Sequence, residues 1–303
     1  MSAAPLDLRG IHAVLYAFFD ASEHLDREVM RRQIEICLAA GVSGITVLGL
    51  ATEGAKLTAE EQRQVMAWTA EDVAGRTPLG ITILGASMAE QVSMVRAAEH
   101  AGADWLILQP PPVGAYAAGE YLDFFSRVMS ETALPCAIQN APQYLGRGLT
   151  ADDIAGLLAR HPTMRTIKAE GSAIEVSALI ERTAGRLAVL NGRGGLELPD
   201  VLEAGASGFI LAPDAVDHAV RAMRAFAAGD PAQAAALHAA AAPSISFVMQ
   251  SIETLICYGK RLFAARAGLT VHDRAPALRP TEFGLACVER HAAALGPFAS
   301  MAS

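Results

Sequence analysis

The sequence predicts an α/β protein: a closed (β/α)8 TIM barrel followed by a C-terminal helical subdomain. Eight short apolar runs recur along the chain, with helical segments between them. Most runs are continuously apolar instead of alternating, which is typical of parallel strands covered by helices. No GxGxxG motif follows the first run, so we prefer the barrel to an open dinucleotide-binding sheet. The predicted strands are 11–19, 44–50, 79–85, 105–109, 134–140, 164–169, 187–191 and 208–212.

The segments between the strands carry helix start and stop signals. A Ser or Thr followed by an acid three residues later predicts a capping box at three helix starts. An Ala-Gly pair before the next strand predicts helix ends, because glycine tolerates the left-handed conformation found there. The starts are Thr58 with Glu61, Ser87 with Glu90 and Ser172 with Glu175, and the end glycines are Gly41, Gly75, Gly102, Gly185 and Gly205.

The repeated units divide the chain into a catalytic barrel, residues 1–229, and a helical subdomain, residues 230–303. In the subdomain the Ala-rich stretch 232–243 predicts a packed helix, because alanine is the best helix former. A long helical pattern follows over 244–268, and another covers 281–294.

The composition and net charge of the chain argue against nucleic acids and membranes as partners. The chain has 303 residues, 52% of them hydrophobic, and a net charge of −8 with no basic run. A chain of this charge offers little to a nucleic-acid backbone or an anionic membrane surface, so we expect neither as a partner. The apolar stretch 11–19 is too short to span a bilayer and lacks a basic segment before it.

The cysteines and histidines indicate neither a disulfide framework nor a metal site. The four cysteines form no CxxC pair, and the eight histidines form no HxH or HExxH motif. Reduced cysteines fit a cytoplasmic location. The cysteines are Cys37, Cys136, Cys257 and Cys287.

Candidate functional residues lie at the carboxyl ends of the strands, where barrels of this kind build their active sites. Only three of the 24 basic residues are lysines, Lys56, Lys168 and Lys260, and only Lys168 lies at such an end. We expect the other two to be solvated or interfacial charges. The strand ends are 49–53, 109–112, 139–140, 168–171, 191–194 and 210–213.

Lys168 is the candidate nucleophile. Period-two alternation sends Thr166, Lys168 and Glu170 to the barrel interior. An apolar barrel mouth disfavours an ammonium group and frees an amine that can form a Schiff base with a carbonyl. Arginine cannot supply a neutral amine, so a lysine retained here in an arginine-rich chain favours catalysis. The alternative is a structural ion pair between Lys168 and Glu170.

Six motifs, in order along nearly the whole chain, resemble those of the class I aldolase superfamily of dihydrodipicolinate synthase and N-acetylneuraminate lyase. The resemblance implies a (β/α)8 barrel with a C-terminal helical subdomain, commonly a homotetramer, in which Lys168 is the Schiff-base lysine. The motifs are Phe19-Asp20 with Leu25-Asp26, Gly49-Leu50-Ala51-Thr52-Glu53 with Leu57-Thr58, Gln139-Asn140-Ala141-Pro142, Ile167-Lys168, Gly205-Ala206-Ser207-Gly208-Phe209-Ile210 and Arg274-Ala275-Pro276.

The chain departs from the family pattern where proton transfer takes place. The family's tyrosine beside the lysine falls on Gln139, whose amide does not transfer a proton at ordinary pH. Two threonines that help to hold the substrate carboxylate fall on Leu50 and Ala51, with Thr52 adjacent.

Further departures concern the second substrate of the synthase branch. Its loop tyrosines fall on Pro111 and Pro112, and its arginine falls on Tyr144, with Arg147 nearby. We therefore expect a reaction other than dihydrodipicolinate synthesis.

Other groups can replace the missing ones. Glu170 can act as acid or base if burial favours its protonated form, and Arg193 can bind a carboxylate. The alternatives are a local salt bridge for Glu170 and a surface charge for Arg193, and Tyr144 is another source of a hydroxyl. The remaining expected contacts to substrate come from Gln139, Asn140, Ala51, Thr52 and Ile210.

These residues predict a cofactor-independent Schiff-base lyase, of aldolase, dehydratase or deaminase type, acting on a small pyruvate-like 2-oxo acid such as a 2-keto-3-deoxy sugar acid. We expect a homo-oligomer, a tetramer or dimer. The competing hypothesis is a non-catalytic family member that binds a 2-oxo acid. A pyridoxal phosphate role for Lys168 has only the weak glycine loop 192–195 in its favour.

Overall fold

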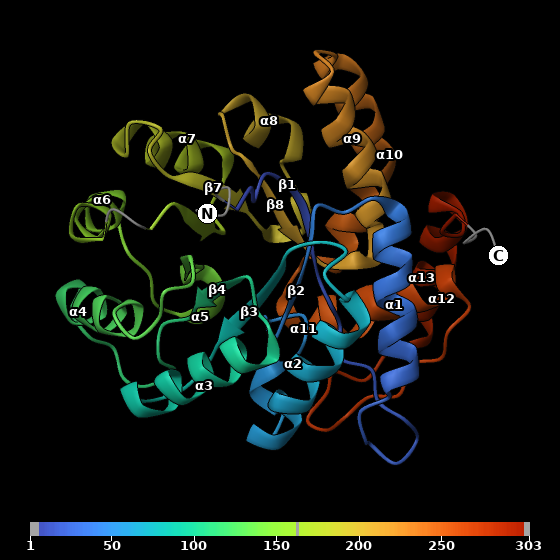
Figure 1. The fold of residues 1–303 in the computed structure, drawn as a ribbon. Helices are drawn as coiled ribbons and strands as arrows, with labels where there is room; N and C mark the ends of the chain where they lie inside the picture. The colour runs from blue at the N-terminus through green and yellow to red at the C-terminus, as the bar shows by residue number, and fades with distance from the viewer. Residues whose placement is uncertain (1–5, 162–163, 300–303) are drawn as a thin grey trace.

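The computed structural model describes residues 6–161 and 164–299. Eight parallel strands close into a barrel in chain order, β1 to β8, with β8 pairing back onto β1. The prediction of a (β/α)8 barrel is therefore confirmed (Figure 1). The strands are β1 (Gly10–Val14), β2 (Gly44–Val47), β3 (Leu79–Ile83), β4 (Trp105–Leu108), β5 (Cys136–Asn140), β6 (Thr166–Ala169), β7 (Ala188–Asn191) and β8 (Gly208–Leu211).

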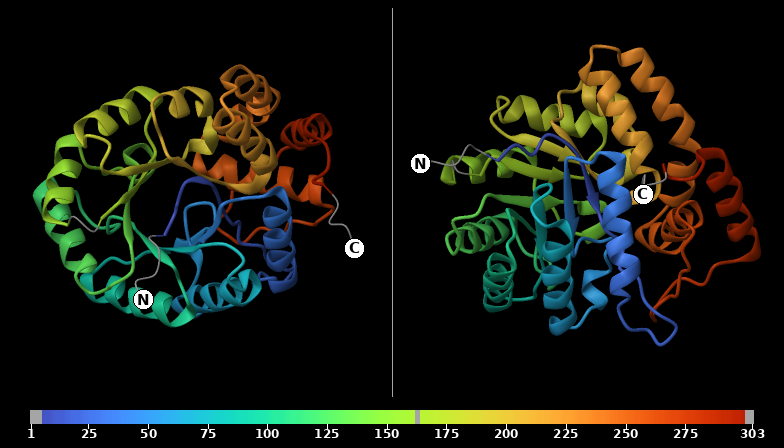
Figure 2. Two further views of the ribbon diagram at one scale, coloured as in Figure 1. Left: turned by 45° about the horizontal axis from the view of Figure 1, so that its top comes forward. Right: turned by 45° about the vertical axis from the view of Figure 1, so that its right-hand side comes forward.

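Helices surround the strands as a ring, and the C-terminal helices lie outside one side of that ring (Figure 2). The helices that follow the barrel strands are α1 (Arg27–Ala40), α2 (Ala59–Val73), α3 (Met88–Ala101), α4 (Ala118–Met129), α5 (Pro142–Leu145), α6 (Ala151–Arg160), α7 (Ala173–Arg182), α8 (Leu198–Glu203) and α9 (Val216–Ala227). Short 3₁₀ turns follow three of the strands: η1 (Gly54–Lys56), η2 (Arg193–Gly195) and η3 (Pro213–Ala215).

The strands are shorter than predicted because other bonds replace the sheet ladder at their carboxyl ends. The strand expected over 11–19 ends at Val14. Beyond it, the backbone N–H of Tyr16 donates to the Gln33 side chain, whose amide donates back to the Tyr16 carbonyl. The strand expected over 44–50 ends before Leu48, whose φ of 61° is left-handed. Apolar composition alone could not distinguish these residues from the strands.

The predicted caps are confirmed with one correction. Capping boxes form at Thr58 and Ser172. Ser87 accepts from the backbone N–H of Glu90, but the Glu90 carboxylate accepts from Ala86 instead of closing the box. All five predicted end glycines have positive φ values, from 66° to 96°.

The C-terminal subdomain corrects a second expectation. The single helix predicted over 244–268 is wrong, since α10 (Pro231–Val248) ends and the chain bends by 107° before helix resumes. Ser251 caps the new start, with its backbone and side chain bonded to Thr254. The chain continues through α11 (Ile252–Thr254), the π-helical turn η4 (Leu255–Gly259), α12 (Lys260–Ala267) and α13 (Glu282–Leu295).

The length and apolar composition of the helices are weak evidence for a membrane span. Among the described helices, none alone is long and apolar enough to cross a bilayer, although α10 and the bent segment after it pass the test as a pair.

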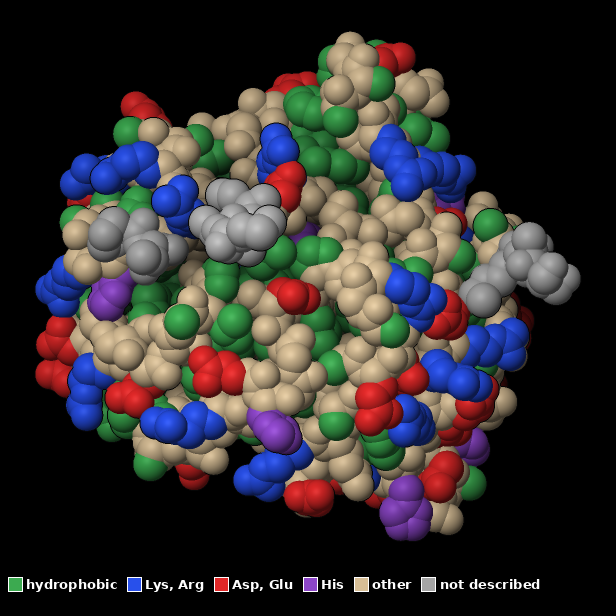
Figure 3. Space-filling model, viewed as in Figure 1, with side chains coloured by type: hydrophobic (Ala, Val, Ile, Leu, Met, Phe, Trp, Pro, Cys, Tyr) green, Lys and Arg blue, Asp and Glu red, His purple; other side chains and the backbone are tan. Residues whose placement is uncertain are grey.

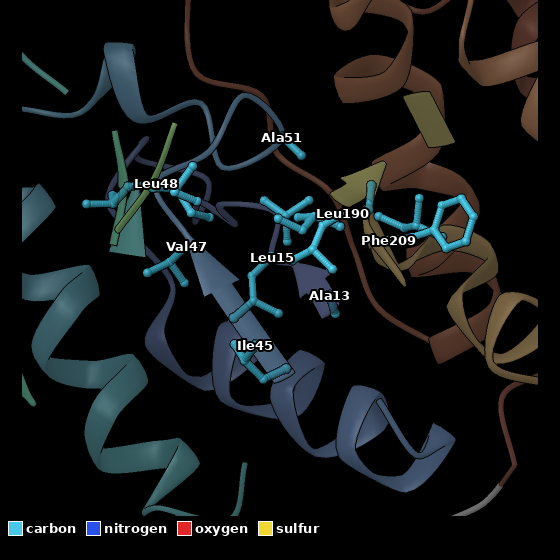
Figure 4. Close-up of a cluster of buried hydrophobic side chains, with 14 of the residues drawn as sticks. Ala13, Leu15, Ile45, Val47, Leu48, Ala51, Leu190 and Phe209 are labelled. Atoms are coloured by element: carbon cyan, nitrogen blue, oxygen red, sulfur yellow. The ribbon is translucent and has the colours of Figure 1, made fainter. Parts of the chain in front are cut away.

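Apolar side chains fill the space between the strands and the surrounding helices. Figure 4 shows part of this core, with Leu15 and Leu190 near the centre, Ile45 and Val47 on one side and Phe209 on the other. At the amino end of the barrel, the His12 and Trp105 rings pack edge to face, 5.6 Å apart. The polar groups of the candidate site lie at the carboxyl ends of the strands, where barrels of this kind build their active sites.

Candidate active site

Three polar side chains converge at the carboxyl ends of β4, β5 and β6. Gln139 and Lys168 are register partners on neighbouring strands, and Gln109 directly follows β4. Parallel register partners point to the same face of a sheet, so these side chains lie at one level inside the barrel. All three are buried.

Lys168 and Glu170 form a buried ion pair. Lys168 Nζ lies 3.0 Å from Glu170 Oε1, and both side chains are about 5% exposed. The structure thus brings together the two residues that alternation placed on one face. This contact is compatible with both roles expected for Glu170, a salt-bridge partner and an acid–base group.

Gln139 hydrogen-bonds to the same carboxylate. Its Nε2 donates to Glu170 Oε1 at 2.7 Å, and its Oε1 accepts from Gln109 Nε2 at 2.8 Å. An amide at this position can orient a carboxylate, but it leaves proton transfer to another group. Sequence reasoning placed Gln109 at a strand end without giving it a role.

The loop after β7 packs directly against Glu170. A Cβ built on Gly192 would lie 2.8 Å from Cγ and Cδ of Glu170. Asn191 fixes this approach, since its Nδ2 donates to the carbonyls of Ala169 and Gly171 on either side of Glu170. Sequence reasoning considered this loop for Arg193 and for its glycine pattern, and did not foresee the contact between Gly192 and the candidate acid–base group.

Tyr144 lies within the electrostatic field of the same site. Burial raises the pKa of its hydroxyl, the negative charge of Glu170 adds to the rise, and the positive charge of Arg193 opposes it. The Arg193 guanidinium itself pairs with Glu197 and is about three-quarters buried. Tyr144 and Arg193 therefore form the polar rim next to Lys168 and Glu170.

Two residues expected to contact substrate form hydrogen bonds with the backbone. Asn140 uses both ends of its amide on Leu149, donating to the carbonyl and accepting from the N–H, at 2.9 and 2.8 Å. Thr52 donates its hydroxyl to the Leu15 carbonyl at 2.6 Å and is fully buried. Each therefore fastens a loop at the barrel mouth.

The other two expected contacts, Ala51 and Ile210, are buried apolar residues at the ends of β2 and β8. Figure 4 shows Ala51 near the cluster that includes Leu190. Leu190 is the register partner of Lys168 on β7. Lys168 thus lies in register between the polar Gln139 on β5 and the apolar Leu190 on β7.

Of the two alternatives expected for Lys260, a solvated or an interfacial charge, the solvated one is wrong. Its side chain is 1% exposed and pairs with Glu53, which also accepts from Lys56 at 2.6 Å. Burial lowers the pKa of Lys260, against the charge of Glu53. The sequence pattern on either side of Lys260 did not show that α12 faces the loop after β2, because that contact joins distant segments.

Charges of both signs cover the molecular surface. Figure 3 shows Lys and Arg side chains interspersed with Asp and Glu around the rim of one face. Within residues 6–161 and 164–299, no group of three His, Cys, Asp or Glu side chains is arranged to hold a metal ion.

A closed barrel that carries a buried lysine beside a carboxylate at the carboxyl end of β6 is a class I aldolase-like (β/α)8 barrel. The model of the dihydrodipicolinate synthetase family matches residues 7–283. The chain belongs to this family.

Comparison with individual proteins agrees with this assignment. The chain is 34% identical over 236 residues to 4-hydroxy-tetrahydrodipicolinate synthase of Methanoculleus marisnigri, covering 76% of this chain and 80% of the relative. A prophage protein of the dihydrodipicolinic acid synthase family from E. coli K12, solved in complex with pyruvate, superimposes with a TM-score of 0.88. At 24% identity, covering 95% and 98% of the two chains, this likeness shows the fold.

The synthase of Methylacidiphilum fumariolicum gives a similar result. It superimposes with a TM-score of 0.87 at 24% identity, covering 95% of this chain and 96% of that one.

Proposed function

We propose that this protein is a cofactor-independent Schiff-base lyase that acts on a small 2-oxo acid, of the kind represented by 2-keto-3-deoxy sugar acids. The observation that carries the proposal is the buried Lys168, with Nζ 3.0 Å from Glu170 Oε1 inside the barrel mouth. A carboxylate at this distance can take a proton from the ammonium and leave an amine able to attack a carbonyl.

The reaction follows from that pair. The Lys168 amine attacks C2 of the 2-oxo acid, and loss of water gives an imine whose protonated form withdraws electrons from C3. Cleavage of the C3–C4 bond or loss of a hydroxide from C4 then becomes favourable. For C3–C4 cleavage, Glu170 accepts the proton of the C4 hydroxyl, C4 becomes a carbonyl, and the bonding electrons pass to the iminium to give an enamine. For elimination, Glu170 accepts the C3 proton and returns it to the hydroxide that leaves C4 as water. Tyr144 and Arg193 face the distal part of the substrate.

The departures from the synthase pattern favour a lyase of this kind. Gln139 supplies an amide where the family has a tyrosine, and Leu50 and Ala51 replace two threonines. The 34% identity to a named synthase favours a second candidate, 4-hydroxy-tetrahydrodipicolinate synthase activity. A third is a 2-oxo-acid-binding protein without turnover, for which the ion pair would serve only structure.

Borohydride trapping tests the proposal directly. The purified protein is incubated with a panel of 2-oxo acids, including pyruvate, reduced with borohydride and examined by intact mass and peptide mapping. We expect one adduct, at Lys168, and none in Lys168→Ala or in Lys168→Arg, which keeps the positive charge beside Glu170. An adduct that maps to Lys56 or Lys260, or that persists in both variants, would overturn the mechanism.

We also propose that the chain forms a homo-oligomer, a dimer or tetramer, in the cytoplasm. Large apolar side chains exposed at Tyr116 and Phe283, 54% and 76% respectively, support an assembly. All four cysteines are free and buried, which suits a reducing compartment. Light scattering on the purified protein measures the assembly, and a monomer at micromolar concentration would contradict it.

A further inference from the structure

Three glutamines, Gln91, Gln109 and Gln139, are linked by a line of hydrogen bonds that ends at Glu170. Gln91, on α3, donates its Nε2 to the backbone carbonyl of Gln109 at 2.9 Å. The Gln109 side chain donates to Gln139 Oε1 at 2.8 Å, and Gln139 Nε2 donates to Glu170 Oε1 at 2.7 Å. All three are buried, so water does not compete freely for these bonds.

The donor and acceptor properties of Glu170 set the orientation of the two side-chain amides in this line. An ionised carboxylate only accepts hydrogen bonds, so Gln139 presents its NH2 group to Glu170. Its oxygen then points at Gln109, which must present NH2 in turn. The Gln109 backbone carbonyl, held by Gln91, anchors the first member of the line. One orientation of both side-chain amides therefore satisfies all the bonds.

We propose that Gln109 is a positioning residue of the active site: it donates to the oxygen of Gln139 and thereby holds the Gln139 NH2 group against the Glu170 carboxylate. This role rests on the proposed function only in its consequence for turnover. The device itself, a glutamine that fixes the direction of a second glutamine, can be measured without any substrate.

Loss of Gln109 changes the balance between the two forms of Glu170. Without a donor, the buried oxygen of Gln139 has no partner, and leaving such a group unsatisfied is costly. A flipped Gln139 amide recovers a partner only if Glu170 is protonated and donates to that oxygen. Removing Gln109 therefore favours protonated Glu170. The other charged or titratable groups that face Glu170 are Lys168 from β6, Tyr144 from α5 and Arg193 from η2.

The test is a titration of the full-length protein labelled with 13C at glutamate carboxyl carbons. The Glu170 resonance is assigned by its loss in Glu170→Gln. We expect Gln109→Met, which keeps the length of the side chain and removes the donor, to move the Glu170 titration midpoint up by about one pH unit, the effect of one hydrogen bond. Gln62→Met is the control: it removes an amide that donates to the backbone carbonyls of Gly54 and Leu57, outside this line, and its Glu170 midpoint should stay at the wild-type value.

A double-mutant cycle shows whether Gln109 acts through Gln139. In a Gln139→Leu background, Gln109→Met should cause no further change in the Glu170 midpoint. An unchanged midpoint in Gln109→Met, or an equal shift with and without Gln139, would overturn the proposal. Where turnover is measurable, kcat should fall about tenfold with KM changed less than about twofold, as expected when proton transfer and not binding is impaired.

Failure of the proposed function has a different signature. Absence of a borohydride adduct at Lys168 would remove the lyase mechanism, whereas the carboxylate titration would still report on Gln109. Conversely, a Lys168 adduct with an unchanged Glu170 midpoint in Gln109→Met would keep the lyase and exclude the positioning role.

Discussion

Gln139 donates a 2.7 Å hydrogen bond to Glu170, and the same carboxylate oxygen lies 3.0 Å from the Lys168 amine. The amide that replaces the family tyrosine is thus joined to a group that does transfer protons. The site has an amide at this position, next to a carboxylate that is held between a lysine and that amide.

The first prediction concerns that carboxylate. Glu170→Gln keeps the size of the side chain and removes its ability to exchange a proton. Schiff-base trapping at Lys168 should persist, while turnover of the true substrate should fall roughly 100-fold or more, the usual size of a lost acid–base group. Steady-state rates measure this change. Turnover within a few-fold of wild type would reduce Glu170 to an ion-pair partner and leave Tyr144 as the next proton donor.

The second prediction concerns Gly192. A methyl group there would overlap Glu170 Cγ and Cδ, and the backbone on both sides is held by Asn191 and β7. Gly192→Ala should displace the carboxylate and lower turnover by about 10- to 100-fold, as misplacement of a catalytic group does. Gly156→Ala, where the added methyl meets open space, is the control and should retain full turnover. Equal rates in the two variants would contradict the prediction.

The third prediction tests the departures from the synthase pattern. Restoring the family tyrosine in Gln139→Tyr should not create appreciable 4-hydroxy-tetrahydrodipicolinate synthase activity, because Leu50, Ala51 and Pro112 also differ. The wild type provides the baseline in the same assay. Robust activity in the variant would mean that Gln139 alone separates this chain from the synthases, and robust activity in the wild type would establish the second candidate function.

The fourth prediction concerns the buried Lys260–Glu53 pair. Lys260→Met leaves the buried Glu53 carboxylate with only the more exposed Lys56 as a partner, so it should lower the free energy of unfolding by about 3 kcal/mol. Lys56 pairs with the same carboxylate from a more exposed position, and Lys56→Met should cost less than about 1 kcal/mol. Urea unfolding monitored by circular dichroism compares the two variants, and a smaller loss for Lys260→Met would refute the assignment.

The fifth prediction is a dependence of stability on pH. Burial raises the pKa of Asp214 to about 6, although Tyr16 donates a 2.9 Å hydrogen bond to its carboxylate. Between pH 4 and 6 the folded chain therefore holds a proton that the unfolded chain releases, and this contribution to stability is lost as pH rises through 6. The loss is about 3 kcal/mol.

Asp214→Asn removes that titration and keeps an oxygen for Tyr16. Thermal unfolding should show the variant to be more stable than wild type at pH 7.5, with the difference disappearing near pH 4. A difference that does not vary with pH would mean that Asp214 titrates normally in the folded protein.

The barrel could be predicted from the sequence, because apolar strands, helix caps and end glycines are local signals that repeat with each βα unit. It also identified Lys168 and Glu170 as neighbours on one face, since alternation along a strand needs no knowledge of other strands. It could not set the strand ends, since the bonds that end β1 come from Gln33 on α1.

Contacts between segments that are distant in the sequence could not be predicted, because they depend on how the strands and helices pack. Gln109 and Gln139 meet because parallel neighbours align in register, and Gly192 meets Glu170 because β6 and β7 are adjacent. Asn140 and Thr52 were expected to face substrate. The sequence did not show that their side chains form hydrogen bonds with the backbone of Leu149 and Leu15. The burial of Lys260 could not be predicted for the same reason. The carboxylate that compensates its charge belongs to Glu53, which lies 207 residues away along the chain.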